Sequence, residues 1–318
     1  MTKTLTPRTG KTASQRVIRR RGDRVFAGIS TGAGILILVI LAGVTIFLTV
    51  EGVPGILASP SEVNSGESFI AYVWPLVFGT ILAAGLALAM ALPVAIGVAL
   101  FISHYAPRRL GHTLGYLIDL LAAVPSVVYG LWGIQFLSVQ LVPFYQWLAE
   151  NAAFIPFFGG PASVTGRTIL TAGIVLAVMV LPIMTAICRE IFLQTPRLHE
   201  EAALALGATK WEMIRMAVFP YARSGVVSAA MLGLGRALGE TLAVAMVLSA
   251  SGVVTFNLIS NTNPSTIAAN IALSFNESSG LSVNALIASG LVLFIITFVV
   301  NFAARAVVNR RKEFSGAN

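Results

Sequence analysis

Residues 26–50 read FAGISTGAGILILVILAGVTIFLTV, an apolar run without a charged side chain. A helix needs about 20 apolar residues in succession to cross the hydrocarbon core of a bilayer. This run is long enough, and it lacks the short alternating segments that are typical of a membrane β-barrel. It therefore predicts a transmembrane α-helix, because in lipid only helices and closed barrels satisfy every backbone hydrogen bond.

The composition extends this prediction to the whole chain. Hydrophobic residues make up 56% and charged residues 11%, whereas a soluble domain carries about 25% charged residues. Such a chain cannot cover a water-facing surface, which excludes a cytosolic enzyme, a disordered protein and a disulfide-built secreted protein. We predict an all-α integral membrane protein with six transmembrane helices. After the first helix at 26–50, the others are expected at approximately Tyr72–Ile102, Leu114–Leu141, Thr168–Ile187, Gly225–Leu248 and Ser282–Val308.

The basic residues indicate how these helices are oriented. On this assignment, 19 of the 21 Lys and Arg residues lie on one side of the membrane, whereas the opposite loops hold only Arg167 and five glutamates. The positive-inside rule then places both termini in the cytoplasm. We expect residues 1–25 to form a basic cytoplasmic arm that meets anionic lipid rather than nucleic acid, and residues 310–318 to form a cytoplasmic tail. The first run is too long for a cleaved signal peptide.

The chain lacks a recognisable site for ATP, a metal or covalent catalysis. Thr9-Gly10-Lys11-Thr12 is similar to the end of a P-loop, but Leu5 stands where the first glycine is needed and no strand precedes it. The glycines between Gly233 and Gly239 have the wrong spacing for a dinucleotide-binding loop and lie inside a predicted helix. We therefore expect no catalytic residue, metal or cofactor in this chain. Energy for transport would come from an ion gradient or from a separate subunit.

The cytoplasmic segment from about residue 190 to 222 contains signals for two short helices. Pro196 suits a helix start, and Glu200 and Glu201 lie in the opening turns, where the helix dipole favours acidic side chains. Gly207 can end the first helix, and Thr209 can cap a second one whose apolar stripe would include Met213, Met216 and Ala217.

This segment resembles the EAA loop of ABC importer permeases. Glu201-Ala202-Ala203 is followed after three residues by Gly207, and Phe219-Pro220 closes the pattern; Ala217 and Phe219 stand where the family usually has Ile and Leu. The resemblance implies that the first short helix docks on a separate ATP-binding subunit, with Glu200, Glu201, Ala202, Ala203 and Gly207 as coupling residues. The alternative is an amphipathic interfacial helix that has no partner.

Arg236 and Glu240 lie inside the predicted fifth helix, four residues apart and therefore on one helix face. A charge inside the membrane costs several kcal/mol, so each should face a partner or a wet cavity. One reading is a structural ion pair that holds helices together. The other is an anion site, in which Arg236 offers the planar fork of donors that suits a tetrahedral oxyanion while Glu240 holds Arg236 and competes with the substrate.

Residues 235–244, GRALGETLAV, closely resemble the C-type permease subunit of the phosphate-specific transport family, as do residues 124–133, VPSVVYGLWG. The resemblance covers about residue 70 to the C-terminus and implies an ABC importer permease core at 70–309 with the type I fold. It associates Arg236 and Glu240 with phosphate passage. Ser126 and Tyr129 could line the same path, or they could satisfy the backbone that Pro125 leaves unpaired.

The resemblance also implies partners: a homologous permease subunit, two ATP-binding subunits that carry ATP and Mg, and an extracytoplasmic phosphate-binding protein. We therefore expect a permease subunit of an ATP-driven phosphate importer in the inner or plasma membrane. Three alternatives remain at this point. They are the same architecture for sulfate or molybdate, a gradient-driven secondary transporter, and a membrane receptor that relays phosphate status.

Overall fold

The structure is a computed structural model that describes residues 21–63 and 66–312. Most of the basic arm predicted at 1–25 lies outside the described residues, namely 1–20. Most of the tail predicted at 310–318 also lies outside them, namely 313–318. Six helical segments are long and apolar enough to cross a membrane, as the sequence predicts. They are Arg24–Leu57, Phe69–Tyr105, Ser126–Asn151, Ile169–Leu193, Lys210–Leu238 and Leu281–Ala306.

The chain divides into two units, Met1–Phe47 and Leu48–Asn318. What the structure describes of the first unit is the beginning of α1 (Arg21–Leu57). This helix is longer at both ends than the apolar run at 26–50, because neither the polar residues before that run nor Glu51 after it interrupts a helix. Everything below concerns the second unit.

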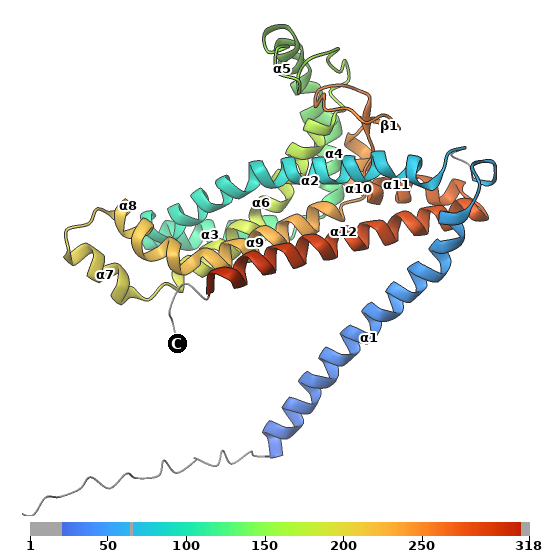
Figure 1. Ribbon diagram of the computed structural model, residues 1–318. Helices are drawn as coiled ribbons and strands as arrows, with labels where there is room; N and C mark the ends of the chain where they lie inside the picture. Colours follow the sequence, from blue (N-terminus) through green and yellow to red (C-terminus); the bar gives the residue numbers. More distant parts are fainter. Residues whose placement is uncertain (1–20, 64–65, 313–318) are drawn as a thin grey trace, which may run out of the picture. The chain divides into compact units, whose positions relative to one another are not determined.

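The centre of the second unit is built on α2 (Phe69–Leu100) and α6 (Ile169–Leu193), with α9 (Phe219–Leu238) against both (Figure 1). One face of α2 carries an alanine at every fourth position, and each is at most 1% exposed. Small side chains at this spacing let helix backbones approach closely, as at many membrane helix interfaces. These alanines are Ala83, Ala87, Ala91, Ala95 and Ala99.

A second stripe of small residues lies on α9 and faces α6. A Cβ atom on Gly225 would lie 2.4 Å from Cδ1 of Ile191, and one on Gly233 would lie 2.6 Å from Sδ of Met184. Ala229 lies between the two glycines and is fully buried. The spacing of four in this part of the sequence is therefore a packing feature that brings α9 onto α6.

The third predicted helix, Leu114–Leu141, is wrong as a single span. Its first part belongs to the amphipathic helix α3 (Arg108–Ala122), which follows the π-helical turn η2 (Phe101–Tyr105). Pro125 has no N–H to donate to the carbonyl of Leu121, so the chain turns at 123–125 before the spanning segment starts. That segment consists of α4 (Ser126–Trp132), η3 (Gly133–Leu137) and α5 (Ser138–Asn151).

The fifth predicted helix, Gly225–Leu248, starts earlier and ends earlier than expected. It continues from α8 (Lys210–Met213) through the π-helical turn η4 (Ile214–Val218) into α9. Gly239 ends α9, and the short helix α10 (Leu242–Val247) follows after Thr241. The hydropathy of the sequence does not reveal this break, because the residues on both sides of it are apolar.

The segment after α10 folds back and packs against α2 and α6. Its strands β1 (Ala250–Ser251) and β2 (Asn263–Pro264) pair in parallel, and the Asn263 Oδ1 atom accepts the Ile169 N–H at 3.0 Å. A Cβ on Gly79 of α2 would lie 2.3 Å from the Ser265 carbonyl oxygen, so this approach requires a glycine. The chain continues with α11 (Ile267–Ser274), η5 (Phe275–Glu277) and α12 (Leu281–Lys312); η1 (Pro60–Glu62) lies between α1 and α2.

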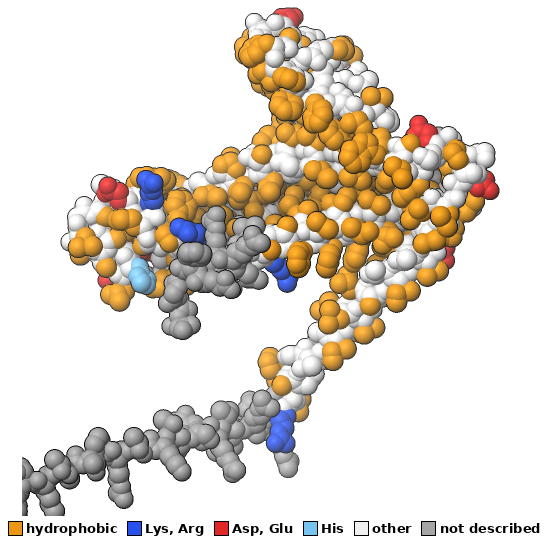
Figure 2. Space-filling model, in the orientation of Figure 1, with side chains coloured by type: hydrophobic (Ala, Val, Ile, Leu, Met, Phe, Trp, Pro, Cys, Tyr) orange, Lys and Arg blue, Asp and Glu red, His pale blue; other side chains and the backbone are white. Residues whose placement is uncertain are grey.

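The distribution of side chains agrees with a membrane-spanning bundle. Figure 2 shows hydrophobic side chains along the length of the second unit, whereas most of its visible charged side chains lie toward the ends, near α7 (Arg197–Ala205) and α8 at one end and in the loops at the other. Exposed apolar side chains such as Ile81, Phe136 and Phe298 are the surface that lipid would cover.

Candidate functional site

Arg236 lies in the last turn of α9, two residues before that helix ends. Its side chain is half-buried, and its Nε atom is buried without a hydrogen-bond partner. The residue lines a cavity of about 750 Å³ at the side of α9. A buried guanidinium nitrogen without an acceptor is costly, so the site favours an acceptor that enters the cavity.

Glu240 does not lie on the same helix face as Arg236, and this part of the sequence prediction is wrong. Gly239 ends α9, so the carboxylate lies in the break before α10, where its Oε1 accepts the Ala243 N–H at 3.1 Å. Glu240 as a whole is 9% exposed. No salt bridge joins Glu240 to Arg236 within the described residues. Here the carboxylate satisfies a free N–H at the start of α10.

Tyr129 pairs with the backbone carbonyl that Pro125 leaves without a donor, which is one of the two roles that the sequence indicates. Its hydroxyl donates to the Leu121 carbonyl oxygen at 3.0 Å, four residues before Pro125. Ser126 is half-buried and begins α4.

The two breaks in the spanning segments lie side by side, because α4 packs against α10. A Cβ on Gly130 would lie 2.9 Å from the Ala243 Cα atom, and one on Gly133 would lie 2.7 Å from Cγ2 of Val247. The glycines of the 124–133 stretch therefore allow the close approach that brings the two sequence motifs together.

The cavity beside Arg236 is also lined by a second arginine, Arg305 of α12. Arg305 is one of the 19 basic residues that the sequence places on the cytoplasmic side. A signal was present: Asn301 and Arg305 lie four apart near the end of an apolar run and thus share a helix face. The cavity is lined by Ile183, Val227, Ser228, Met231, Leu232, Gly235, Arg236, Asn301, Ala304 and Arg305.

The two short helices predicted around Gly207 are present. The N–H of Gly207 donates to the Leu204 carbonyl and the N–H of Ala208 to the Ala203 carbonyl, and Gly207 has a φ of 86°. This is the Schellman arrangement, which needs a residue that tolerates positive φ. Thr209 and Glu212 then form a capping box that starts α8.

The apolar stripe expected beyond Gly207 is only partly correct. Met213 is buried, but Met216 is 59% exposed, and Ile214 and Val218 are the fully buried residues. The reason is the π-helical turn η4, which shifts the helix face by one residue. These side chains pack with Phe192 of α6 at the base of the loop.

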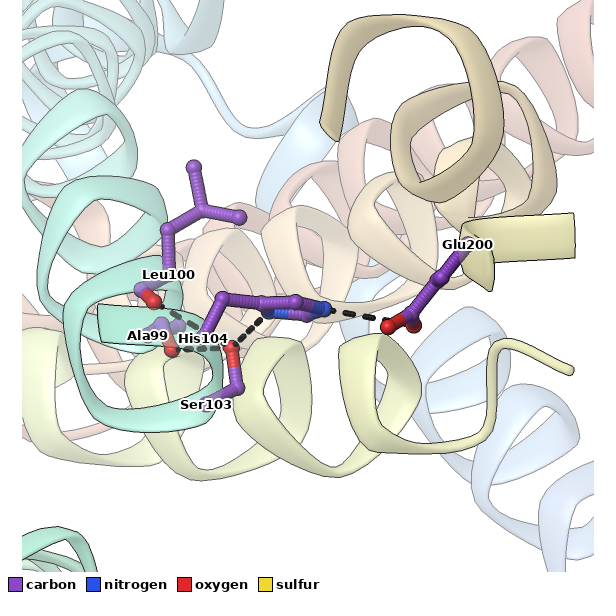
Figure 3. Close-up of polar contacts among 5 residues, drawn as sticks. All are labelled: Ala99, Leu100, Ser103, His104 and Glu200. Atoms are coloured by element: carbon purple, nitrogen blue, oxygen red, sulfur yellow. Dashed lines mark hydrogen bonds and ion pairs between the residues drawn. The ribbon is translucent and has the colours of Figure 1, made fainter. Parts of the chain in front are cut away.

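The first short helix, α7, is tied to the membrane core by Glu200 and Ala203. Figure 3 shows the His104 ring between Ser103 and Glu200; its Nε2 atom lies 3.4 Å from Glu200 Oε1, and its Nδ1 atom lies 2.7 Å from Ser103 Oγ. Ser103 Oγ in turn donates to the Ala99 carbonyl at 2.8 Å. Ala203 packs against the apolar cluster that includes Leu100 of α2 and Phe192 of α6.

The other predicted coupling residues face outward. Glu201, Ala202 and Gly207 are exposed, and the neighbouring Leu198 is 75% exposed. The structure therefore divides the five predicted coupling residues into two that contact this chain and three on an open surface. An exposed leucine beside small residues is a surface that can receive a partner.

Comparisons with known proteins agree with this geometry. The family described as "binding-protein-dependent transport system inner membrane component" matches residues 91–313. The chain is similar to "Phosphate transport system permease protein PstC 2" of Mycobacterium tuberculosis, with 47% identity over 300 residues that cover 91% of this chain and 92% of that protein. It is also similar to the PstC protein of Mycobacterium leprae, with 43% identity over 306 residues that cover 92% and 95%.

The fold is shared with a solved structure described as a bacterial ABC transporter involved in the import of the acidic polysaccharide alginate. The TM-score is 0.55 at 15% identity, over 91% of this chain and 96% of that chain. The architecture is thus that of the type I ABC importer permeases. With the matches above, the chain belongs to the family of binding-protein-dependent transport system inner membrane components, the multi-pass membrane permeases of ABC transporters.

Proposed function

We propose that this chain is a permease subunit of an ATP-driven importer and forms half of the translocation path for inorganic phosphate. The observation that carries the proposal is the guanidinium of Arg236, whose buried Nε atom lacks a partner beside an open cavity. The names of the relatives, phosphate transport permeases over more than 90% of this chain, support phosphate as the anion.

In this proposal Arg236 binds the anion and Glu240 limits how long it stays. The planar fork of Arg236 matches two oxygens of a tetrahedral oxyanion. The buried carboxylate of Glu240 follows Arg236 by four residues, and its negative charge repels an anion that stays at this site. Ser126 and Tyr129 at the start of α4 border the same path. Passage requires that binding be weak enough for release.

The energy is proposed to come from two separate ATP-binding subunits that carry ATP and Mg, so that this chain needs no cofactor. The exposed surface of α7, with Glu201, Ala202 and Leu198, would dock on one of them. Glu200 and Ala203 would transmit its displacement, because they join α7 to the inner ends of α2 and α6. A homologous permease completes the path, and an extracytoplasmic binding protein delivers phosphate. Both termini are cytoplasmic on the charge bias of the loops.

The test is phosphate uptake by the complete complex in proteoliposomes, comparing wild type with Arg236→Gln. We expect the variant to lose uptake at least tenfold, because a hydrogen bond to a charged group contributes about 1.5–3 kcal/mol. Arg223→Gln is the matched control, since Arg223 is also on α9 but is exposed and does not line the cavity. Wild-type uptake by Arg236→Gln would contradict the proposal, and stronger competition by sulfate or molybdate than by phosphate would reassign the anion.

A further inference from the structure

Arg305 of α12 lines the same cavity as Arg236 of α9. We infer that Arg305 is a second phosphate-binding station, on the cytoplasmic side of Arg236, to which the anion moves before release. This inference rests on the proposed function, because it identifies a further residue of the same anion path.

The charges in the cavity point to an anion. Two guanidinium groups line it, and none of its lining residues is Asp or Glu. Neither arginine has a salt bridge to a carboxylate within the described residues. Each of these guanidinium groups lines the cavity without a carboxylate partner in the described part of the chain, so the cavity favours an anion over a cation.

The order of the two stations follows from the directions of the helices. Figure 1 shows α9 and α12 side by side, with the start of α9 and the end of α12 toward the end of the molecule that carries α7 and α8. Arg236 is 17 residues from the start of α9 and Arg305 is 7 residues from the end of α12. At about 1.5 Å per residue, these separations are roughly 26 Å and 10 Å. Arg305 is therefore closer to the cytoplasmic end.

The residues between the two arginines supply weaker, neutral donors. Ser228 and Asn301 line the cavity, and Asn301 lies one helical turn before Arg305. From Val227 to Arg236 the α9 side of the cavity extends over nine residues, or about 13 Å. Two arginines at different depths of one elongated cavity suit stepwise passage, in which each site binds the anion without trapping it.

The first experiment measures uptake by the complete complex with Arg305→Gln. We expect the phosphate uptake rate to fall about tenfold, as for the loss of one hydrogen bond to a charged group, while the ATP-binding subunits still co-purify. The control Arg223→Gln removes a cytoplasmic-side charge outside the cavity and should leave uptake unchanged. If Arg305→Gln keeps uptake within twofold of wild type while Arg236→Gln is inactive, this inference is wrong and the proposed function stands. If neither arginine variant alters phosphate uptake, both are wrong.

A second experiment leaves Arg305 in place and so does not depend on how that variant assembles. Cys188 is the one cysteine of the chain and is fully buried, so a thiol introduced by Asn301→Cys can be modified selectively. We expect phosphate to slow its reaction with a charged thiol reagent severalfold. A thiol introduced by Phe302→Cys, on the exposed surface of α12 outside the cavity, should react at the same rate with or without phosphate. Equal protection at both positions, or at neither, would overturn the inference.

Discussion

At the scale of single residues, Glu240 has two tasks that can be separated. Its Oε1 accepts the Ala243 N–H, which stabilises the start of α10 whether or not the side chain is charged. In the proposed path, its charge acts on the anion that passes Arg236. The structure assigns the first task directly, and the proposed path adds the second.

We expect Glu240→Gln to keep the melting temperature of the purified complex, because the amide oxygen can still accept the Ala243 N–H. Phosphate uptake should fall severalfold, because without the negative charge the anion leaves Arg236 more slowly. Glu240→Ala loses the hydrogen bond as well and should cost about 1 kcal/mol in addition, seen as a lower melting temperature. Wild-type uptake by Glu240→Gln would show that this carboxylate serves structure alone.

At the scale of elements, the contact between α7 and the η2 end of α2 explains how a short exposed helix is held against the rest of the protein. α7 has no buried residue, so the packing of Ala203 and the contact of Glu200 with His104 hold it in place. His104 is in turn fixed by Ser103, whose hydroxyl bonds to the backbone of α2.

His104→Ala should partly uncouple ATP hydrolysis from transport. The His104–Glu200 contact is largely buried, with side chains 8% and 22% exposed, but its 3.4 Å length is at the limit of a hydrogen bond. Its loss is therefore expected to cost about 1 kcal/mol and to lower phosphate uptake per ATP hydrolysed by a few-fold. His112→Ala is the control, since His112 is exposed on α3 with no polar contact among the described residues. A transport-to-ATPase ratio equal in both variants and wild type would contradict this role for His104.

At the scale of the whole molecule, the proposed path depends on two spanning segments that are broken at similar places. The breaks at 123–125 and 239–241 lie together because α4 packs on α10. Some backbone groups beside the breaks cannot pair within a helix, and side chains pair with them instead. The Tyr129 hydroxyl bonds the Leu121 carbonyl before the first break, and Glu240 accepts the Ala243 N–H after the second. Irregular backbone at membrane depth is tolerated where protein surrounds it or where it lines a cavity.

Gly79→Ala should destabilise the side of the molecule opposite the coupling loop. The added Cβ would lie 2.3 Å from the Ser265 carbonyl oxygen, and relieving that clash is expected to cost about 1–3 kcal/mol. Gly85→Ala on the same helix is the control, because nothing lies within 4 Å of its Cβ and alanine favours a helix by up to about 1 kcal/mol. The measurement is the melting temperature of each purified complex. An equal melting temperature for the two variants would show that the 263–266 segment does not pack on α2 as described.

The amino-acid sequence by itself determined the number of spans and the two short helices that meet at Gly207. Both depend on near neighbours in the chain: about 20 apolar residues define a span, and Gly207 and Thr209 end and start helices through bonds to residues at most five positions away. The family resemblance, which rests on such short motifs, was confirmed for the same reason.

Only the tertiary structure decided which charged groups meet. The pairing expected for Arg236 and Glu240 assumed an unbroken helix, and Gly239 ends that helix between them. Arg305 joins the cavity of Arg236 from 69 residues away, and His104 meets Glu200 from 96 residues away. Such contacts depend on how close the helices lie, which the small residues of α2 and α9 set jointly with their partners, so no local pattern specifies them.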